Sequence, residues 1–142
     1  MAKKNNTEDL LSEDVKTYCD TMSALSQMDA IYTHIPMEAQ PPKMQPFQAL
    51  RFWEKKKRMG IRNGVPDWYF GWKGGHGWIE LKAPKELIVS LKTGKTIQGK
   101  AAGKLSESQE DFQADCDRLG IKHAICDSVA SVDATLKKWG VI

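Results

Sequence analysis

Residues 64–84 read GVPDWYFGWKGGHGWIELKAP, and this stretch constrains the fold more than any other in the chain. Two short, aromatic-rich apolar runs are separated by KGGHG, whose three glycines can supply the positive φ angles of a tight hairpin. The runs therefore predict two antiparallel strands over 65–72 and 77–84. Three charged residues, Asp67, Glu80 and Lys82, lie inside these runs. Strand interiors exclude charge unless it is paired or has a chemical use.

Strand geometry predicts that the three charged side chains meet. Side chains alternate faces along a strand, so Glu80 and Lys82 point the same way. A hairpin that turns near Gly75 pairs residues whose numbers add up to about 150. That register places Asp67 beside Lys82–Ala83, and all three charged groups on a single patch.

Two carboxylates a few Å apart raise each other's pKa unless a cation lies between them. Mg²⁺ suits such a site, because it takes few protein ligands and keeps several waters. A lysine beside the metal would orient or help deprotonate a water, or stabilise charge on a phosphate. The alternative is structural: Lys82 and Asp67 form a cross-strand ion pair, and Glu80 faces solvent.

Hydrophobic periodicity predicts the secondary structure of the first half of the chain. Spacings of three and four residues predict a helix over 7–27, whose buried stripe is Leu10, Leu11, Val15, Tyr18, Met22 and Leu25. A short β-type run follows at 30–36, and a proline-rich loop at 37–46. A second helix is predicted over 47–60, with an apolar side made of Phe47, Leu50, Trp53 and Met59.

Helix-capping residues and turn residues predict the secondary structure of the second half of the chain. Ser106 and Gln109 form the capping box of a helix that runs to Leu119, with Gly120 as its stop. A strand over 121–128 follows, and then a last helix over 131–140 with Ser131 as its cap. The order is α-β-α-β-β-(loop)-α-β-α, which predicts a small mixed α/β fold in one domain spanning 1–142. We expect residues 1–6 to be disordered and residues 92–104 to form a mobile basic loop.

Composition narrows the class of protein. No run approaches the roughly 18 apolar residues of a transmembrane helix, and the N-terminus lacks the apolar core of a signal peptide. Three widely spaced cysteines indicate reduced thiols rather than a disulfide framework. These features predict a protein of the cytoplasm with no membrane partner.

Charge is distributed unevenly along the chain. Residues 41–104 carry 14 Lys and Arg against four Asp and Glu, a net charge of +10; because the whole chain carries +3, the flanks together carry −7. A basic middle within acidic flanks is typical of a face that binds a polyanion. The alternative is that a basic helix and a lysine-rich loop are simply solvated.

The stretch RMGIRNGVPDWYF…GWIELKAP…GKLSESQEDF resembles the VRR-NUC (virus-type replication-repair nuclease) family of the PD-(D/E)xK nuclease superfamily. The three pieces occur in the family's order and at suitable spacing, and the resemblance extends over nearly the whole chain. It implies a restriction-endonuclease-like core, in an intracellular protein of the kind that viruses and phages encode. One departure is Met37, where the family often has asparagine.

The resemblance implies a role for each matching residue. Asp67 and Glu80 would bind the metal together with the backbone carbonyl of Leu81, and Lys82 would position the attacking water. Gln109 would contact the site, or serve only its capping box. The superfamily often adds an acid from the first helix; Glu13 matches best, Asp14 and Glu8 are rivals, and an ordinary acidic helix face is the alternative.

The function implied is a Mg²⁺- or Mn²⁺-dependent nuclease that hydrolyses DNA, in structured or branched forms such as junctions or flaps, and works as a homodimer. The basic residues expected to contact the DNA backbone are Lys57, Arg58, Arg62, Lys73, Lys85, Lys100 and Lys104. The rival hypothesis is a nucleic-acid-binding module without catalysis, and a third is a nuclease fold retained for protein assembly. Endonuclease or exonuclease action, and the choice between DNA forms and RNA, stay open.

Overall fold

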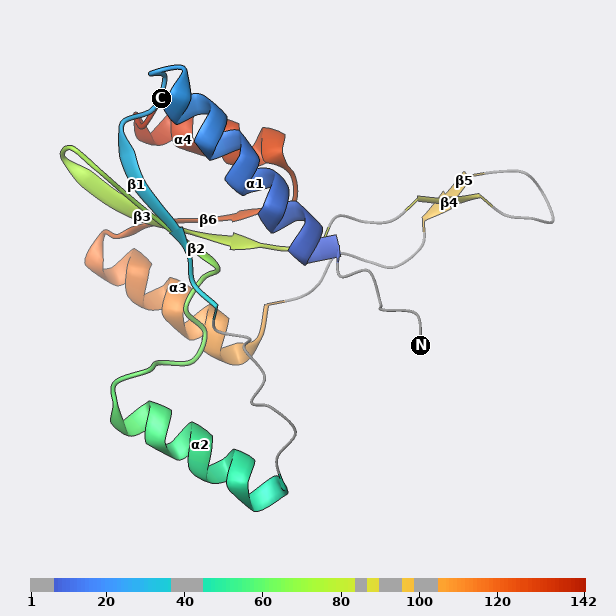
Figure 1. The fold of residues 1–142 in the computed structure, drawn as a ribbon, viewed down its shortest axis with the longest axis vertical. Coiled ribbons are helices and arrows are strands. Elements are labelled where there is room, and N and C mark those ends of the chain that lie inside the picture. Colours follow the sequence, from blue (N-terminus) through green and yellow to red (C-terminus); the bar gives the residue numbers. More distant parts are fainter. Residues whose placement is uncertain (1–6, 37–44, 84–86, 90–95, 99–104) are drawn as a thin grey trace.

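The computed structural model describes residues 7–36, 45–83, 87–89, 96–98 and 105–142 (Figure 1). The elements run in the predicted order, with one small hairpin added between β3 and α3. They are α1 (Thr7–Ala24), β1 (Ala30–His34), α2 (Pro46–Arg58), β2 (Trp68–Trp72), β3 (Gly75–Leu81), β4 (Leu87–Val89), β5 (Thr96–Gln98), α3 (Glu107–Leu119), β6 (Lys122–Cys126) and α4 (Val129–Trp139). The predicted α/β class is confirmed.

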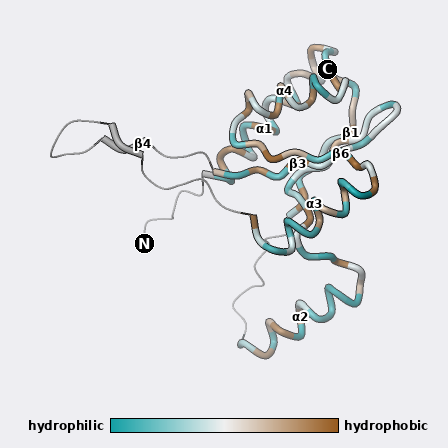
Figure 2. Tube along the Cα trace, turned by 180° about the vertical axis from the view of Figure 1, so that it is seen from behind, coloured by the Kyte–Doolittle hydropathy of each residue, from teal (hydrophilic) through white to brown (hydrophobic). Residues whose placement is uncertain are grey.

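Four strands form one mixed sheet in the order β1-β2-β3-β6. The β1–β2 and β2–β3 pairs are antiparallel, and β3–β6 is parallel. Helices α1 and α4 cover one face of the sheet and α3 the other, while α2 stands away from it (Figures 1 and 2). Because β3 is paired on both sides, its backbone is held more completely than that of the edge strands β1 and β6. No helix in the described residues is long and apolar enough to cross a membrane.

The core lies between the sheet and the α1–α4 layer. Phe70, Ile79 and Leu136 are fully buried there, together with Val15 and Cys19 of α1. The predicted stripe of α1 is therefore partly wrong: Leu10 and Leu25 are 52% and 62% exposed. Leu10 lies one residue out of phase with the buried positions, and Leu25 comes after the helix has ended.

Helix α2 forms where it was predicted, but it has no buried residue. Phe47, Leu50 and Met59 of its predicted apolar side are all more than half exposed. The apolar side is therefore largely exposed in the described part of the chain. The helix starts well, with Pro46 in its first turn and a capping box at Gln45. Its local sequence makes a helix, and no described element covers it.

The predicted start of α3 is confirmed. Ser106 caps it, Gln109 completes the capping box, and Gly120 ends it in the left-handed region at φ 72°. The predicted cap of α4 is wrong: Ser128 caps that helix, and Ser131 lies three residues inside it. The extended backbone of Ser128 lets its hydroxyl accept from the Ser131 N–H, so two serines at a spacing of three make the cap together.

The hairpin forms with a register different from the prediction. Trp72 pairs with Gly75, so the loop is only two residues long, with φ of Gly74 at 95°. Trp68 pairs with Ile79, which sets Asp67 opposite Glu80 rather than beside Lys82–Ala83.

Two of the three loop glycines belong to strand β3, and one of them has a packing role. An ideal Cβ on Gly77 would lie 2.6 Å from the Trp139 ring, so this glycine makes room for a side chain of α4. Loop composition alone overestimated the length of the turn.

The predicted basic loop also contains structure. Thr96–Gln98 form strand β5, which pairs antiparallel with β4 in a two-stranded sheet of its own. The remaining residues of the 92–104 segment, like residues 1–6, lie outside the described residues.

Candidate active site

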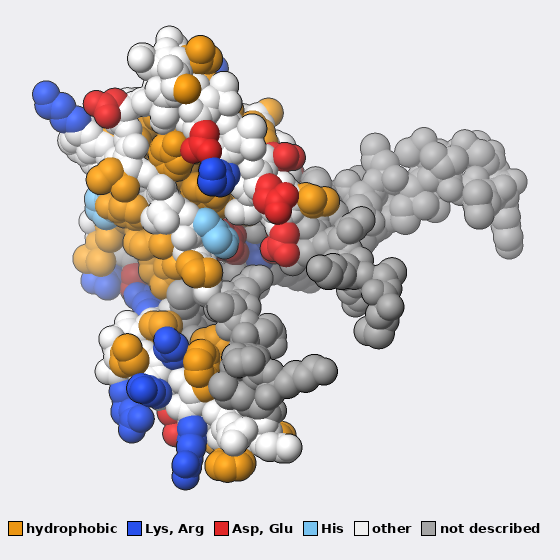
Figure 3. Space-filling view, in the orientation of Figure 1, with side chains coloured by type: hydrophobic (Ala, Val, Ile, Leu, Met, Phe, Trp, Pro, Cys, Tyr) orange, Lys and Arg blue, Asp and Glu red, His pale blue; other side chains and the backbone are white. Residues whose placement is uncertain are grey.

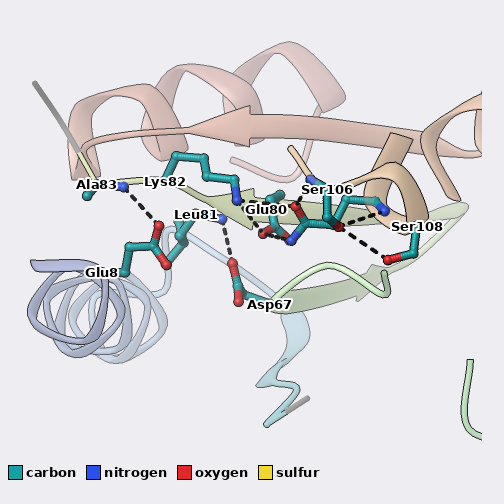
Figure 4. Close-up of polar contacts among 9 residues, drawn as sticks. Glu8, Asp67, Glu80, Leu81, Lys82, Ala83, Ser106 and Ser108 are labelled. Carbon is teal, nitrogen blue, oxygen red and sulfur yellow. Dashed lines mark hydrogen bonds and ion pairs between the residues drawn. The ribbon is translucent and has the colours of Figure 1, made fainter. Parts of the chain in front are cut away.

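The charged residues of the hairpin gather at the end of the sheet where β2 begins and β3 ends (Figure 4). Asp67 immediately precedes β2, Glu80 lies in β3, and Lys82 follows it. Ile79 and Leu81 turn to the opposite face, where they are 0% and 1% exposed in the core. The predicted alternation is confirmed, and it directs Glu80 and Lys82 toward the face that carries α3.

Asp67 is held by three hydrogen bonds from two strands. Its Oδ2 accepts from the Leu81 N–H at 2.7 Å, which joins β2 to the end of β3. Its backbone carbonyl accepts from the Ile35 N–H at 2.6 Å and from Nδ1 of His34 at 2.9 Å. Because a carbonyl oxygen only accepts, Nδ1 of His34 is the donor in this hydrogen bond. The position of Asp67 is therefore set by the end of β1 as well as by β3.

Among the described residues, Glu80 is the charged side chain that is buried, at 3% exposed. Its Oε1 accepts from Nε2 of Gln109 at 2.7 Å and lies 3.6 Å from Nζ of Lys82. Its Oε2 is buried and has no hydrogen-bond partner among the described residues. Burial, and then the neighbouring Asp67 carboxylate, raise the pKa of Glu80 to about 8. The structural alternative, in which Glu80 faces solvent, is contradicted.

Gln109 connects α3 to Glu80 of β3 and to Lys82, which follows that strand. Its Oε1 accepts from Lys82 Nζ at 3.2 Å and from the Ser106 N–H at 2.9 Å, while its amide nitrogen donates to Glu80. Both interpretations of this residue, as helix cap and as site contact, hold at once. The single side chain orients the lysine and the glutamate relative to each other.

An acid of α1 also reaches the site, and it is Glu8. Its Oε1 accepts from the Ala83 N–H at 3.3 Å, and its charge contributes to the raised pKa of Glu80. Glu13, the best match to the family pattern, instead lines a pocket beside β1. Helical phase carries a signal for this difference, because Glu8 lies on the same side of α1 as Leu11 and Val15, which face the sheet.

The pair Asp67 and Glu80 fits a divalent cation. A buried carboxylate oxygen without a partner, beside a second carboxylate that raises its pKa, is an arrangement that a cation would relieve. In the described part of the chain, no three His, Cys, Asp or Glu side chains group closely enough to form a metal site by themselves. A cation here would therefore need other oxygens as well, and the predicted Leu81 carbonyl stays a prediction.

The described basic residues that were predicted to bind DNA lie on different parts of the fold. Lys57 and Arg58 are exposed in the last turn of α2, and Lys73 lies in the hairpin turn, at the end of β2 away from Asp67. Arg62 is engaged, since it donates to Asp115 at 2.7 Å and lies over the ring of Phe112. The other three predicted contacts, Lys85, Lys100 and Lys104, lie outside the described residues.

Gly64 is a positioning residue that the sequence analysis missed. Its φ is +82°, and an ideal Cβ there would lie 2.2 Å from the backbone oxygen of Ser108. The segment that leads to Asp67 thus touches the first turn of α3, next to Gln109. Arg62, bonded to α3 through Asp115, holds the same segment. The sequence feature that could have indicated this role is the glycine two residues before Pro66–Asp67.

Comparison of the chain with protein-family models, with curated proteins and with solved structures found no match at all. The resemblance to VRR-NUC nucleases therefore stays a hypothesis, which rests on the motifs and is to be judged by the geometry of this site.

Proposed function

We propose that this protein is a metal-dependent nuclease that hydrolyses phosphodiester bonds in DNA. The observation that carries the proposal is the buried Glu80 carboxylate between Asp67 and Lys82, one oxygen of which has no partner among the described residues. A protein that only needed a cross-strand ion pair would gain nothing from burying a second acid beside it, because that burial costs free energy. The cost is understandable where a cation and a phosphate complete the site.

In this proposal Asp67 and Glu80 hold Mg²⁺ or Mn²⁺, and Glu8 adds negative charge at the edge of the site. When bound, the ion supplies Lewis-acid stabilisation of the phosphate and a lowered pKa for water. Lys82 orients the attacking water and stabilises negative charge that develops on the phosphate oxygens. Water oxygen bonds to phosphorus, one P–O ester bond breaks, and the leaving oxygen gains a proton, giving a phosphate monoester and a hydroxyl end.

Gln109 keeps this arrangement in place before substrate arrives. Its amide oxygen fixes the ammonium group of Lys82, and its amide nitrogen fixes one oxygen of Glu80, so the other oxygen stays available. Such preorganisation removes the need to reorder side chains during the reaction. The exposed lysine and arginine at the end of α2 attract the DNA backbone without reading its sequence.

The substrate is proposed to be structured DNA such as a flap or a junction, and the active form a homodimer that offers two sites to one branched molecule. The rival is a binding module whose carboxylates are merely structural. The two differ in what depends on Lys82: a nuclease loses turnover without it and keeps its affinity, whereas a binding module has no turnover to lose.

The test is cleavage of end-labelled linear, flapped and four-way-junction DNA with Mg²⁺, Mn²⁺ or EDTA. Lys82→Ala is compared with Lys122→Ala, a lysine on the far edge strand β6. We expect metal-dependent cleavage that Lys82→Ala removes and Lys122→Ala retains, with equal binding in EDTA. Tight binding by all three proteins, without cleavage of any DNA in either metal, would support the binding module instead.

A further inference from the structure

A pocket of about 340 Å³ lies between α1 and the end of β1. Ser12, Glu13 and Lys16 line it from α1, Tyr32 and His34 from β1, and Trp68 from β2. Its volume falls within the range of ordinary small-molecule sites. The pocket is not lined by Asp67, Glu80, Lys82 or Gln109.

The pocket adjoins the candidate active site through two residues. Trp68 follows Asp67 in the chain, and its indole N–H donates to Ser12 at 3.0 Å, which fixes the ring. His34 lines the pocket and also bonds to the Asp67 carbonyl. The pocket is therefore lined by the residue that follows Asp67 and by one that bonds to its carbonyl.

The lining combines flat rings with a free acceptor. Tyr32 and His34 present aromatic surface, and the ring of His34 lies 5.9 Å from that of Trp68, which is 3% exposed. Lys16 is neutralised by Asp20 at 2.6 Å, whereas the Glu13 carboxylate forms no hydrogen bond or ion pair with any residue in the described ranges. A flat, largely apolar group that carries an N–H donor fits this chemistry. A nucleobase with an exocyclic amino group is such a group.

Charge determines which part of a nucleotide can enter. The exposed surface of α1 is acidic, with Asp9, Glu13 and Asp14 near the pocket end of the helix, and Figure 3 shows acidic side chains along this helix while Lys and Arg gather over α2. Phosphates are repelled from such a surface. A neutral base, turned out of its stack, is therefore the part of a nucleotide that suits this pocket.

We propose that this pocket holds an unstacked base of the nucleotide next to the scissile phosphate; the inference rests on the proposed nuclease function. Base flipping of this kind is least costly where the nucleotide is already unpaired. The protein would thereby select DNA with an unpaired nucleotide at the cut, and prefer adenine, guanine or cytosine there to thymine, which lacks an amino group.

The first arm of the test measures binding and needs no cleavage. The indole N–H of Trp68, assigned with Trp68→Phe, is followed by NMR in EDTA during titration with dAMP, dCMP, dTMP or deoxyribose 5-phosphate. We expect shifts with dAMP and dCMP, weaker ones with dTMP, and none without a base. Glu13→Gln should remove the preference for amino bases, and Asp14→Asn, its exposed neighbour, should not.

The second arm measures cleavage of flapped DNA in which the nucleotide beside the mapped cut is intact or abasic. We expect the abasic substrate to lose about tenfold in kcat/KM, and Tyr32→Leu to lose a similar factor on intact DNA only. Equal cleavage of both substrates by the wild type would contradict the proposal that the pocket binds a base, and would leave the nuclease proposal standing. Base-dependent shifts without any cleavage would overturn the nuclease proposal while supporting a nucleobase site. A change of oligomeric state in Tyr32→Leu, with no response to bases, would contradict base binding by the pocket. It would indicate instead that the pocket contacts a second copy of the chain.

Discussion

The β2–β3 hairpin and helix α2 depart in opposite directions from the rule that apolar groups are buried and charges exposed. The hairpin buries Glu80 to 3% exposure, whereas α2 leaves Phe47, Leu50 and Met59 more than half exposed. The buried carboxylate has Gln109 of α3 as a hydrogen-bond donor and Lys82 at 3.6 Å, and the carboxylates of Asp67 and Glu8 face it as like charges. The exposed apolar residues of α2 have no comparable support in the described residues. Burial at the hairpin thus follows from contacts between elements, whereas the sequence of α2 forms a helix without such contacts among the described residues.

The largest effect should follow from changing the buried charge itself. Glu80→Gln keeps the size of the side chain and removes its negative charge. If the hairpin is a catalytic site, kcat should fall by about 10²- to 10³-fold, the range seen when one preorganised electrostatic group is lost. Single-turnover cleavage measures this loss, with DNA affinity in EDTA as the control. A kcat of Glu80→Gln within a few-fold of the wild-type value would contradict a catalytic role for the hairpin.

A second change tests whether the hairpin depends on its contact with α3. Gly64→Ala forces a Cβ against the Ser108 carbonyl at a positive φ, and should cost about 3 kcal/mol of unfolding free energy. Gly60→Ala is the matched control, because its φ is also positive, at +104°, but nothing lies within 4 Å of its Cβ. It should cost about 1 kcal/mol. Urea unfolding of both variants measures the difference, and equal losses would contradict the proposed contact.

The raised pKa of Glu80 predicts how stability changes with pH in EDTA. The folded state binds this proton more tightly than the unfolded chain, whose pKa is near the ordinary 4.5. The stabilisation is full below 4.5 and is lost as pH rises through about 8. Carboxyls with a lowered pKa, such as Asp133, act only in the acid range.

The melting temperature should thus fall between pH 5 and 8.5 in wild-type protein and stay nearly level in Glu80→Gln. Adding Mg²⁺ at pH 8.5 should restore stability to the wild type alone. Parallel curves for the two proteins would show that Glu80 is not the titrating group.

For α2, smaller effects are expected, and on substrate affinity. Replacing Lys57 and Arg58 together by alanine should raise KM several-fold with kcat unchanged. The slope of log affinity against log salt should decrease by about 2, one for each lost phosphate contact. Fluorescence titrations at several salt concentrations measure this slope. A loss of kcat instead of affinity would mean that α2 acts on the chemistry.

The smallest effect should come from an apolar residue of α2. Leu50→Ala is expected to change the free energy of unfolding by about 0.5 kcal/mol or less, because the side chain is already in water. The same substitution in α4, Leu136→Ala, removes a fully buried side chain and should cost about 2–5 kcal/mol. Urea unfolding compares the two. A large loss for Leu50→Ala would show that α2 is covered in the folded protein after all.

Local signals predicted the fold well, and non-local contacts account for the errors. The start of α3 at Ser106 and the order of the elements depend on neighbouring residues, so they were predictable. The hairpin register depends on a two-residue turn and on the space that Gly77 leaves for Trp139, a residue 62 positions away. Hydrophobic periodicity shows that α2 has an apolar side, but it does not show whether another element covers that side.

In the candidate site, too, local signals predicted some residues and non-local contacts account for the errors. Asp67, Glu80 and Lys82 lie on one hairpin, and their meeting follows from strand alternation even with a register that is wrong by three. Glu8 comes from another element, and motif spacing pointed to Glu13 instead. The support that His34 gives to Asp67 depends on β1 lying beside β2, which no local pattern contains.

Gln109 takes part both in starting α3 and in assembling the site, since its Oε1 accepts from the Ser106 amide and from Lys82. Fraying of the first turn of α3 would therefore release Lys82 and Glu80 in the same event. The site and the helix end form one cooperative unit, with a common opening free energy. Hydrogen exchange at the Ser106 amide would then report on the integrity of the candidate site even without any ligand.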